Sequence, residues 1–185
     1  YYRLANQEPS ALQMESFKGQ VPYRIASKKD TYYVKFVATD PLPLIQVRLM
    51  GSSEDLLFIL DTGGGHVIVD TEVAKALNLK SFGQSERMFA GGNRAMIELG
   101  RVEKMKVGDL TLENIPVSIQ NTSRYAAVAG GKKVSGIIGT VFLYHFLSSI
   151  DYPNGQLVLR SRNKDPKLKN VKSAQPFWMA STHIM

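Results

Sequence analysis

Residues 56–65 read Leu-Leu-Phe-Ile-Leu-Asp-Thr-Gly-Gly-Gly, and this stretch decides the fold. Its five apolar residues predict a strand that is buried on both faces. Asp61 follows at the end of that strand, where an ionised carboxylate needs hydrogen-bond donors close by. The hydroxyl of Thr62 and the N–H groups of a tight turn through Gly63–Gly65 can supply those donors. The stretch therefore predicts a carboxylate held within reach of a substrate, although its plainest interpretation is a strand followed by a polar turn.

A second apolar strand that ends in glycine lies downstream, Gly136-Ile137-Ile138-Gly139. A short amphipathic helix is predicted after Thr140. The segment Ser149-Ile150-Asp151-Tyr152 then passes through the turn Pro153-Asn154-Gly155 into a closing strand over residues 156–159. Asn-Gly is a strong hairpin signal because both residues tolerate positive φ.

These motifs, in this order, make residues 43–160 resemble the retropepsin-like aspartic peptidases. The long connections resemble the bacterial and archaeal aspartyl proteases more than the viral enzymes. The resemblance implies an all-β fold, a retropepsin-like closed β-barrel that forms one acid-protease half with one or two short helices. It also implies site residues: catalytic Asp61, an active-site loop of Thr62, Gly63 and Gly64, and loop-supporting Ile137, Ile138 and Gly139. Gly64 departs from the family pattern, which has Ala or Ser there, and predicts a looser loop.

A glycine-tipped hairpin is predicted between residues 84 and 100, where apolar segments flank Gly91-Gly92-Asn93. By the resemblance, this hairpin is a flap that covers a bound peptide. Its tip residues Phe89, Ala90, Gly91 and Gly92 would then bind substrate. The alternative is a plain sheet hairpin without that role.

Other segments follow the same all-β pattern. Alternation of apolar and polar residues predicts strands over 32–37 and 44–49, and a short strand is predicted over 67–69. Further strands are predicted over 102–107 and 112–120, and a polar loop over 121–134. Asp70 offers an acceptor cap with Glu72 in the first turn, so a helix is predicted over 70–77.

Composition divides the chain into four parts. Residues 1–30 are predicted to be an N-terminal arm, interpreted as the tail of a preceding helical region, and residues 31–160 are predicted to form the peptidase-like domain. Residues 161–174 form a basic linker. Residues 175–185 resume an apolar pattern and resemble the start of a further unit, which in this family can be a second repeat.

The net charge of +7 does not indicate a nucleic-acid-binding protein. Most of it comes from Arg160, Arg162 and four lysines up to Lys172, opposed by Asp165 alone, in a stretch without aromatic residues that could stack on bases. A solvated linker is therefore expected, with an acidic partner or membrane surface as the alternative. No apolar run approaches the ~20 residues of a transmembrane helix.

No metal or cofactor is expected. The chain has no cysteine, and His66, His145 and His183 are isolated in sequence, which disfavours zinc. His66 lies just beyond the acidic loop and is a candidate to tune or contact the site. The segment Gly130-Gly131-Lys132-Lys133 lacks the first glycine and the final Ser or Thr of a phosphate-binding loop. A serine-hydrolase Gly-x-Ser-x-Gly motif is absent from the sequence.

Peptide hydrolysis by this chemistry needs two carboxylates, one acting as base toward water and one, protonated, as acid. The sequence has one Asp-Thr-Gly, and Asp109 and Asp151 are interpreted as turn residues. The partner of Asp61 is expected from a homodimer or from a second repeat, so an isolated monomeric half should be inactive. A non-catalytic dimerisation or peptide-binding module is the alternative. The compartment stays open, with a periplasmic or extracellular location slightly favoured over the cytoplasm.

Overall fold

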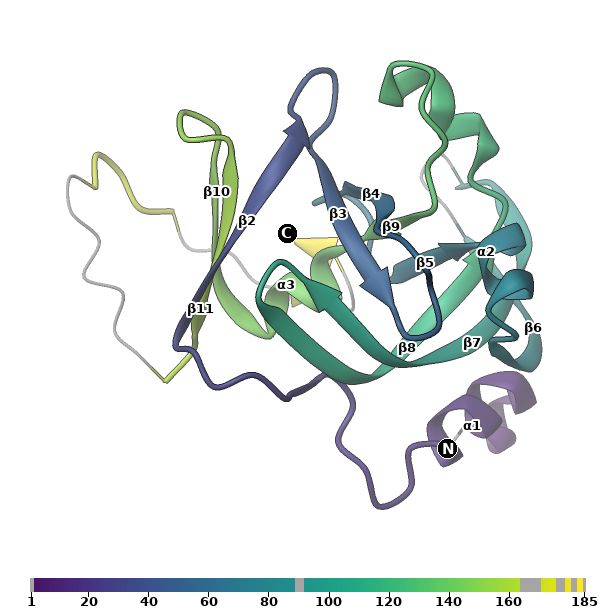
Figure 1. Ribbon diagram of the computed structural model, residues 1–185. Coiled ribbons are helices and arrows are strands. Elements are labelled where there is room, and N and C mark those ends of the chain that lie inside the picture. Colours follow the sequence, from purple (N-terminus) through teal and green to yellow (C-terminus); the bar gives the residue numbers. More distant parts are fainter. Residues whose placement is uncertain (1, 89–91, 164–170, 176–178, 181–182, 185) are drawn as a thin grey trace.

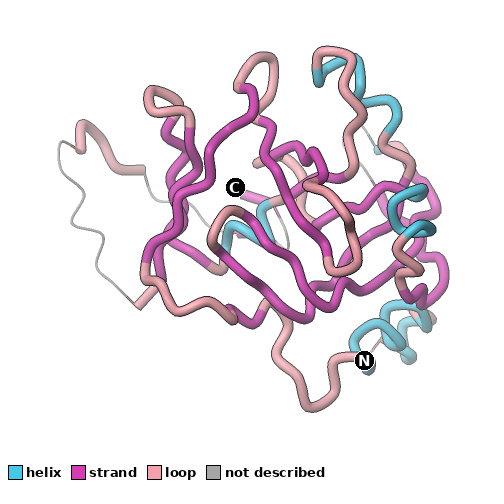
Figure 2. Tube along the Cα trace, viewed as in Figure 1, coloured by secondary structure: helices cyan, strands magenta, loops and turns pink. Residues whose placement is uncertain are grey.

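The computed structural model describes residues 2–88, 92–163, 171–175, 179–180 and 183–184, and most of its regular structure is β (Figures 1 and 2). The N-terminal segment contains α1 (Glu8–Glu15), and two short helices follow, α2 (Thr71–Ala76) and α3 (Thr140–Tyr144). The larger sheet consists of β1 (Arg24–Ile25), β2 (Thr31–Ala38), β3 (Leu44–Leu49), β4 (Leu56–Leu60), β5 (Val67–Asp70), β6 (Lys80–Met88), β7 (Arg94–Val107), β8 (Leu110–Gln120), β9 (Gly136–Ile138), β10 (Phe146–Asp151) and β11 (Gln156–Ser161).

The sheet runs in the order β10-β11-β2-β3-β4-β9-β5-β8-β7-β6, and β1 pairs with β8. An additional pairing between β3 and β7 closes a ring of neighbouring strands in the order β3-β4-β9-β5-β8-β7. The mostly-β fold with two short helices in the domain is as predicted from the sequence. The closed barrel is not confirmed, because β2, β6, β10 and β11 lie outside that ring.

Strand β9 lies between β4 and β5, parallel to β4 and antiparallel to β5. Phe58 pairs with Gly136 and Leu60 with Ile138, so the end of β9 lies beside the end of β4. A Cβ atom on Gly136 would come within 2.4 Å of the Ile68 carbonyl oxygen. Only glycine fits here, and this close approach joins two residues, Ile68 and Gly136, that are 68 positions apart in the sequence.

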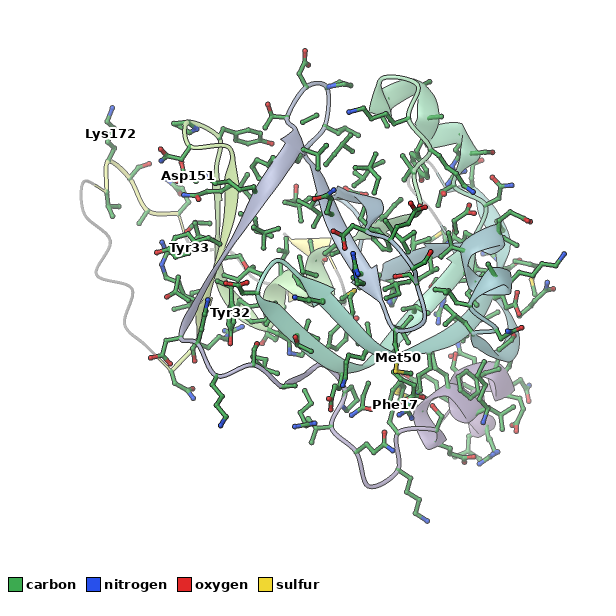
Figure 3. The ribbon with its side chains drawn as sticks, in the orientation of Figure 1. Phe17, Tyr32, Tyr33, Met50, Asp151 and Lys172 are labelled. Carbon is green, nitrogen blue, oxygen red and sulfur yellow. The ribbon has the colours of Figure 1, made fainter. Side chains whose placement is uncertain are left out.

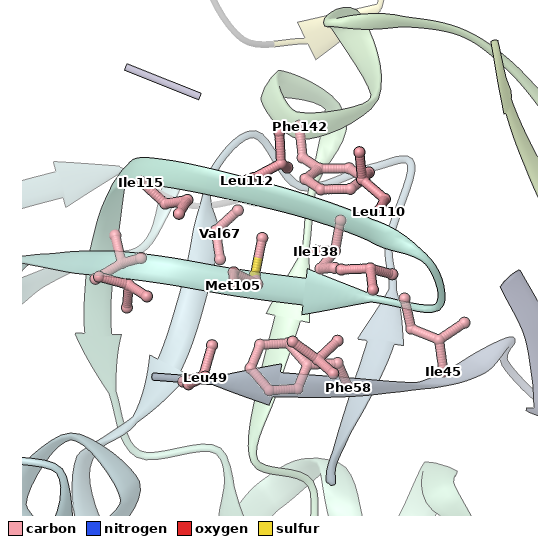
Figure 4. Packing of buried hydrophobic residues seen from close by; sticks show 14 of the residues in the cluster. Ile45, Leu49, Phe58, Val67, Met105, Leu110, Leu112, Ile115, Ile138 and Phe142 are labelled. Carbon is pink, nitrogen blue, oxygen red and sulfur yellow. The ribbon is translucent and has the colours of Figure 1, made fainter. Parts of the chain in front are cut away.

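The main hydrophobic core lies inside this arrangement and includes Phe58, Val67, Met105, Ile138 and Phe142 (Figure 4). Each of these side chains is fully buried. Burying such a side chain contributes about 1.5–3 kcal/mol. The core therefore fixes β4 and β9 directly below the residues that follow them.

Alternation along β2 shows how one face of the sheet meets the core. Tyr32 is 2% exposed and its neighbour Tyr33 is 60% exposed, so the two rings lie on opposite faces (Figure 3). This is the period-two pattern that predicted the strand.

The N-terminal segment lies against β6, β7 and β8 (Figure 1). The buried side-chain amide of Gln13 donates to the carbonyl oxygens of Gly100 (2.7 Å) and Val117 (3.1 Å). The Arg101 guanidinium lies over the Phe17 ring, 4.6 Å from its centroid. Residues 8–25 are therefore packed onto the domain, and their division from it as a separate arm stays a prediction.

Some local predictions need correction. The separate strands predicted near residues 96–99 and 102–107 form one continuous strand, β7, because both parts pair with β8. The predicted loop over 121–134 contains a 3-10 helix, Ser123–Ala129, whose last residue is buried.

At the C-terminus, β12 (Met179–Ala180) pairs with β13 (His183–Ile184) in a separate two-stranded sheet. Whether residues 175–185 begin a further unit stays a prediction, as does the role of residues 161–174 as a linker. No helix in the described parts of the chain is long and apolar enough to cross a membrane.

Candidate active site

Asp61 directly follows the buried end of β4 and is itself partly exposed. Its backbone N–H donates to the carbonyl oxygen of Ile138 at 2.9 Å, which continues the contact between β4 and β9. The N–H of Gly63 donates to Asp61 Oδ1 at 2.8 Å. A side chain that accepts from the backbone two residues ahead forms a local turn and is oriented by it. The carboxylate is thus held from below by the sheet and from one side by its own loop.

Glycines at 63 and 64 leave space for this carboxylate. A Cβ atom on Gly64 would lie 2.7 Å from Asp61 Oδ2, and one on Gly63 would lie 3.3 Å from Oδ1. Neither glycine has positive φ. The reason for glycine at these positions is therefore the close approach of the carboxylate rather than a left-handed backbone. Thr62, between them and Asp61, is exposed.

The start of α3 holds the same loop from behind. The Thr140 N–H and hydroxyl donate to the Gly64 carbonyl oxygen at 2.8 and 3.1 Å, and the Val141 N–H donates to that of Gly65 at 2.9 Å. Since these bonds fix consecutive carbonyl groups, the looser loop predicted from the extra glycine is not what the structure has. Gly139 fits beneath it without a side chain.

The three residues expected to support the loop differ in their surroundings. Ile138 is fully buried in the main core and Gly139 is buried directly below the loop. Ile137 lines a cavity beside Asp61 and packs in a smaller cluster with Ile59. Ile137 is therefore also placed to contact a ligand.

The cavity beside Asp61 has a volume of about 220 Å³. Its polar wall includes Asp61 and Thr62, and its apolar wall comes from residues far apart in sequence, including Leu42, Ile59, Ile137, Ile150, Tyr125 and Tyr152. The sequence motifs contained Ile150 and Tyr152 but gave no reason to place them near Asp61. Tyr125 was missed because it lies in a segment predicted as a polar loop.

Other acidic residues near strand ends have structural partners. Asp70 caps α2 through the Glu72 N–H, and its second oxygen accepts from the N–H and hydroxyl of Thr122. Burial acts to raise the pKa of Asp70, but these hydrogen bonds outweigh it and hold the pKa below its usual value. Asp109 is ion-paired with Lys29 at the surface.

Asp151 accepts hydrogen bonds from Asn154 and Gln156 within its own hairpin, and these lower the pKa of its carboxyl group. This agrees with its interpretation as a turn residue, at the far side of the molecule from Phe17 (Figure 3).

The predicted flap corresponds to the hairpin of β6 and β7, which pair antiparallel from Lys80–Arg101 to Met88–Arg94. Gly92 has φ +79°, and a Cβ atom there would meet no described residue within 4 Å, which suits a hairpin tip. Phe89, Ala90 and Gly91 lie outside the described residues. Met88 and Met96 near the tip are exposed, so the hairpin presents apolar side chains.

His66 and His145 lie in different settings. His66 is exposed beside the active-site loop. His145 follows α3, stacks on Tyr23 and is partly buried, and burial together with the nearby Arg162 lowers its pKa. No cluster of three or more possible metal ligands occurs among the described residues.

Comparison with known proteins agrees with this geometry. Residues 45–142 match the model of a family described as aspartyl protease. No match was found among curated proteins. Among solved structures, a retropepsin-like aspartic protease from Rickettsia conorii is similar with a TM-score of 0.50 at 16% identity, covering 75% of this chain and 96% of that one.

Two other solved structures are more distant. The retroviral protease-like domain of Ddi1 from Leishmania major has a TM-score of 0.42 at 13% identity, covering 64% of this chain and 87% of that domain. The EIAV protease in complex with an inhibitor has a TM-score of 0.40 at 16% identity, covering 57% of this chain and 88% of that one.

Proposed function

This chain belongs to the aspartyl protease family, and on that premise we propose that it is one half of an aspartic endopeptidase. In this proposal Asp61 supplies one of two carboxylates that activate a water molecule. The observation that carries the proposal is the setting of Asp61: a carboxylate oriented by the Gly63 N–H, on a loop held by α3, at the wall of a cavity of about 220 Å³.

Two carboxylates are needed because one group cannot be both base and acid in the same step. When two carboxylates lie close together, ionising both is unfavourable, so they share a proton. The ionised one removes a proton from water, while the protonated one donates toward the carbonyl oxygen of the scissile peptide bond. The partner of Asp61 would come from a second copy of this chain or from a second repeat.

The residues around Asp61 take roles that follow from their positions. Thr62 is exposed beside the carboxylate and would hydrogen-bond across the contact with the second half. Gly63 and Gly64 let the backbone approach the carboxylate. By the resemblance rather than by any described position, Phe89, Ala90, Gly91 and Gly92 would form a flap that covers the substrate and excludes water. An extended peptide would lie beside the loop, with one apolar side chain in the cavity next to Ile137.

Asparagine at position 61 tests the proposal, because it keeps the shape of the side chain but cannot act as a general base. The assay measures cleavage of a peptide library between pH 3 and 7, using the longest natural form of the polypeptide alongside the 185-residue chain. We expect cleavage that is favoured by acid and lost in Asp61→Asn. Asp109→Asn, which alters an exposed ion-paired acid, is the matched control and should retain activity.

Sedimentation under the assay conditions tests the need for a second half. Activity should appear only in a dimeric form or in a form that carries a second repeat. A strictly monomeric 185-residue chain that cleaves peptides efficiently would contradict the shared pair of carboxylates. A well-folded natural form with no cleavage at all would favour the alternative, a non-catalytic dimerisation or peptide-binding module.

A further inference from the structure

A second cavity, of about 230 Å³, lies between the N-terminal helix and the flap-bearing strands. Its wall includes Ser10 and Gln13 of α1, Arg87 of β6, Leu99 of β7, and His66 and Val141 from the two segments that form the active-site loop and its support. It shares no lining residue with the cavity beside Asp61. The N-terminal segment thus closes a cavity that is separate from the one beside Asp61.

Two polar groups in this wall, the Ser10 hydroxyl and the Arg87 Nε–H, are buried and have no hydrogen-bond partner among the residues that the structure describes. Ser10 is only 4% exposed, so its hydroxyl cannot turn to bulk water. A buried polar group without a partner destabilises the folded state and calls for an explanation such as a bound molecule. The wall therefore offers two unused donors to whatever enters the cavity.

The charge of the wall favours an anion. Arg87 forms no ion pair with the residues that the structure describes, although its strand neighbour Glu86 pairs with Arg94. Within the described parts of the chain, no aspartate or glutamate lines this cavity. A carboxylate accepts from two donors at once and is the natural partner of a guanidinium group.

The size and the remaining walls favour a single side chain. Pockets for drug-sized ligands have volumes of roughly 300–1,000 Å³, and this cavity is smaller. Leu99, Val117 and Val141 provide apolar surface for methylene groups. Glutamate combines two methylene groups with a carboxylate, and so matches both kinds of wall.

We propose that this cavity is an outer specificity subsite that takes a glutamate side chain of the substrate, an inference that rests on the proposed peptidase function. The chain from Asp61 to His66 spans five residues, which is at most about 18 Å. An extended peptide advances about 3.3 Å per residue. The glutamate therefore lies within about five residues of the scissile bond, and Arg87 and Ser10 are its specificity-determining contacts.

Matched peptides that differ only by Glu, Gln or Lys at one position test the subsite, scanned over five positions on each side of the cleaved bond. At one position the wild type should prefer Glu over Gln in kcat/KM by about tenfold or more, as for a hydrogen-bonded charge pair. Arg87→Gln should remove that preference, and Arg87→Glu should replace it by a preference for Lys. Ser10→Ala should reduce the Glu preference by a smaller factor without reversing it.

Arg94→Gln is the matched control, because Arg94 lies on the same hairpin but is exposed and pairs with Glu86. It should keep the Glu preference of the wild type. Cleavage with equal kcat/KM for Glu and Gln at every position would overturn the subsite while leaving the peptidase function intact, and would assign the cavity to water. Absence of cleavage of any peptide by a natural two-carboxylate form would reject the peptidase function and the subsite together.

Discussion

Gly139 lies so close to Gly64 that a Cβ atom on Gly139 would come within 2.5 Å of the Gly64 carbonyl oxygen. The same atom would approach the backbone of Gly65 and His66 to 2.7 Å. The obstacle is backbone on every side, and it cannot move aside as the end of a flexible side chain can. The position of the Asp61 loop is therefore set by the absence of a side chain at residue 139.

Gly139→Ala should displace the loop that carries Asp61. Overpacking of this kind destabilises a protein by about 1–3 kcal/mol. We expect a loss of unfolding free energy in that range by urea denaturation, together with loss of cleavage in the active form. Gly130→Ala is the control, because it also adds a Cβ atom but has nothing within 4 Å. It should cost only the strain of its φ of +63° and retain activity. Full activity of Gly139→Ala would contradict the role of this contact.

Asp70 should stabilise the fold in a pH-dependent manner. Its pKa is held below the reference value of 3.8 in the folded state, so its contribution is complete above that pH and is lost as the pH falls through the folded-state pKa. Asp70→Asn keeps a cap on α2 but weakens acceptance of the two Thr122 donors. We expect the variant to have a free energy of unfolding about 1–3 kcal/mol lower than that of the wild type at pH 7. This difference should become smaller below pH 3.8, as measured by denaturation at several pH values. A constant difference across that range would contradict the assignment. Asp109→Asn, at an exposed ion pair, should have a much smaller effect.

His145 should also make the fold less stable in acid, but in a pH range above that of Asp70. Burial, assisted by Arg162, lowers its pKa from the reference value of 6.5, so protonation favours the unfolded chain. The free energy of unfolding should be unaffected by His145 above pH 6.5 and should decrease as the pH falls from 6.5 to the folded-state pKa of His145. His145→Gln should flatten this decrease in thermal unfolding scans between pH 7.5 and 5. Arg162→Gln should flatten it in part, because burial remains. Parallel curves for wild type and His145→Gln would refute the prediction.

Arg101 should hold the N-terminal segment on the domain. It is 7% exposed, donates to Asn114 at 2.9 Å and to Ser16 and Gln20, and covers the ring of Phe17. Arg101→Ala should lower stability by about 1–3 kcal/mol and should speed proteolytic cleavage within residues 8–25. Arg101→Lys should fail to restore the segment, because an ammonium group lacks the planar fork. Arg24→Ala removes an exposed arginine paired with Glu113 on the same segment and should leave cleavage slow.

Local signals predicted the strands and short helices well. The apolar run before Asp61, the alternation in β2 and β3 and the Asp70 cap each describe a few adjacent residues, and each is present in the structure. The order of the Asp-Thr-Gly and Gly-Ile-Ile-Gly motifs was sufficient for the family.

The packing between distant segments could not be predicted. Gln13 contacts Gly100, and Arg101 contacts Gln20. The local sequence around these residues does not indicate the contacts, because each joins residues that are 81 or more positions apart. The apolar wall around Asp61 was missed for the same reason. The extra glycine at position 64 predicted a loose loop because the sequence does not show which donors bind its carbonyl oxygen. Those donors are on Thr140, 76 residues away.

The insertion of β9 between β4 and β5 means that no short piece of this protein contains an assembled site. Asp61 reaches its position only when a strand made about 75 residues later has entered the sheet. During synthesis, Asp61 would be present in the chain before β9, the strand that accepts a hydrogen bond from its backbone, has been made. Under the proposed function, a partly made chain would therefore lack an assembled Asp61 site and could not contribute to hydrolysis before its folding is complete.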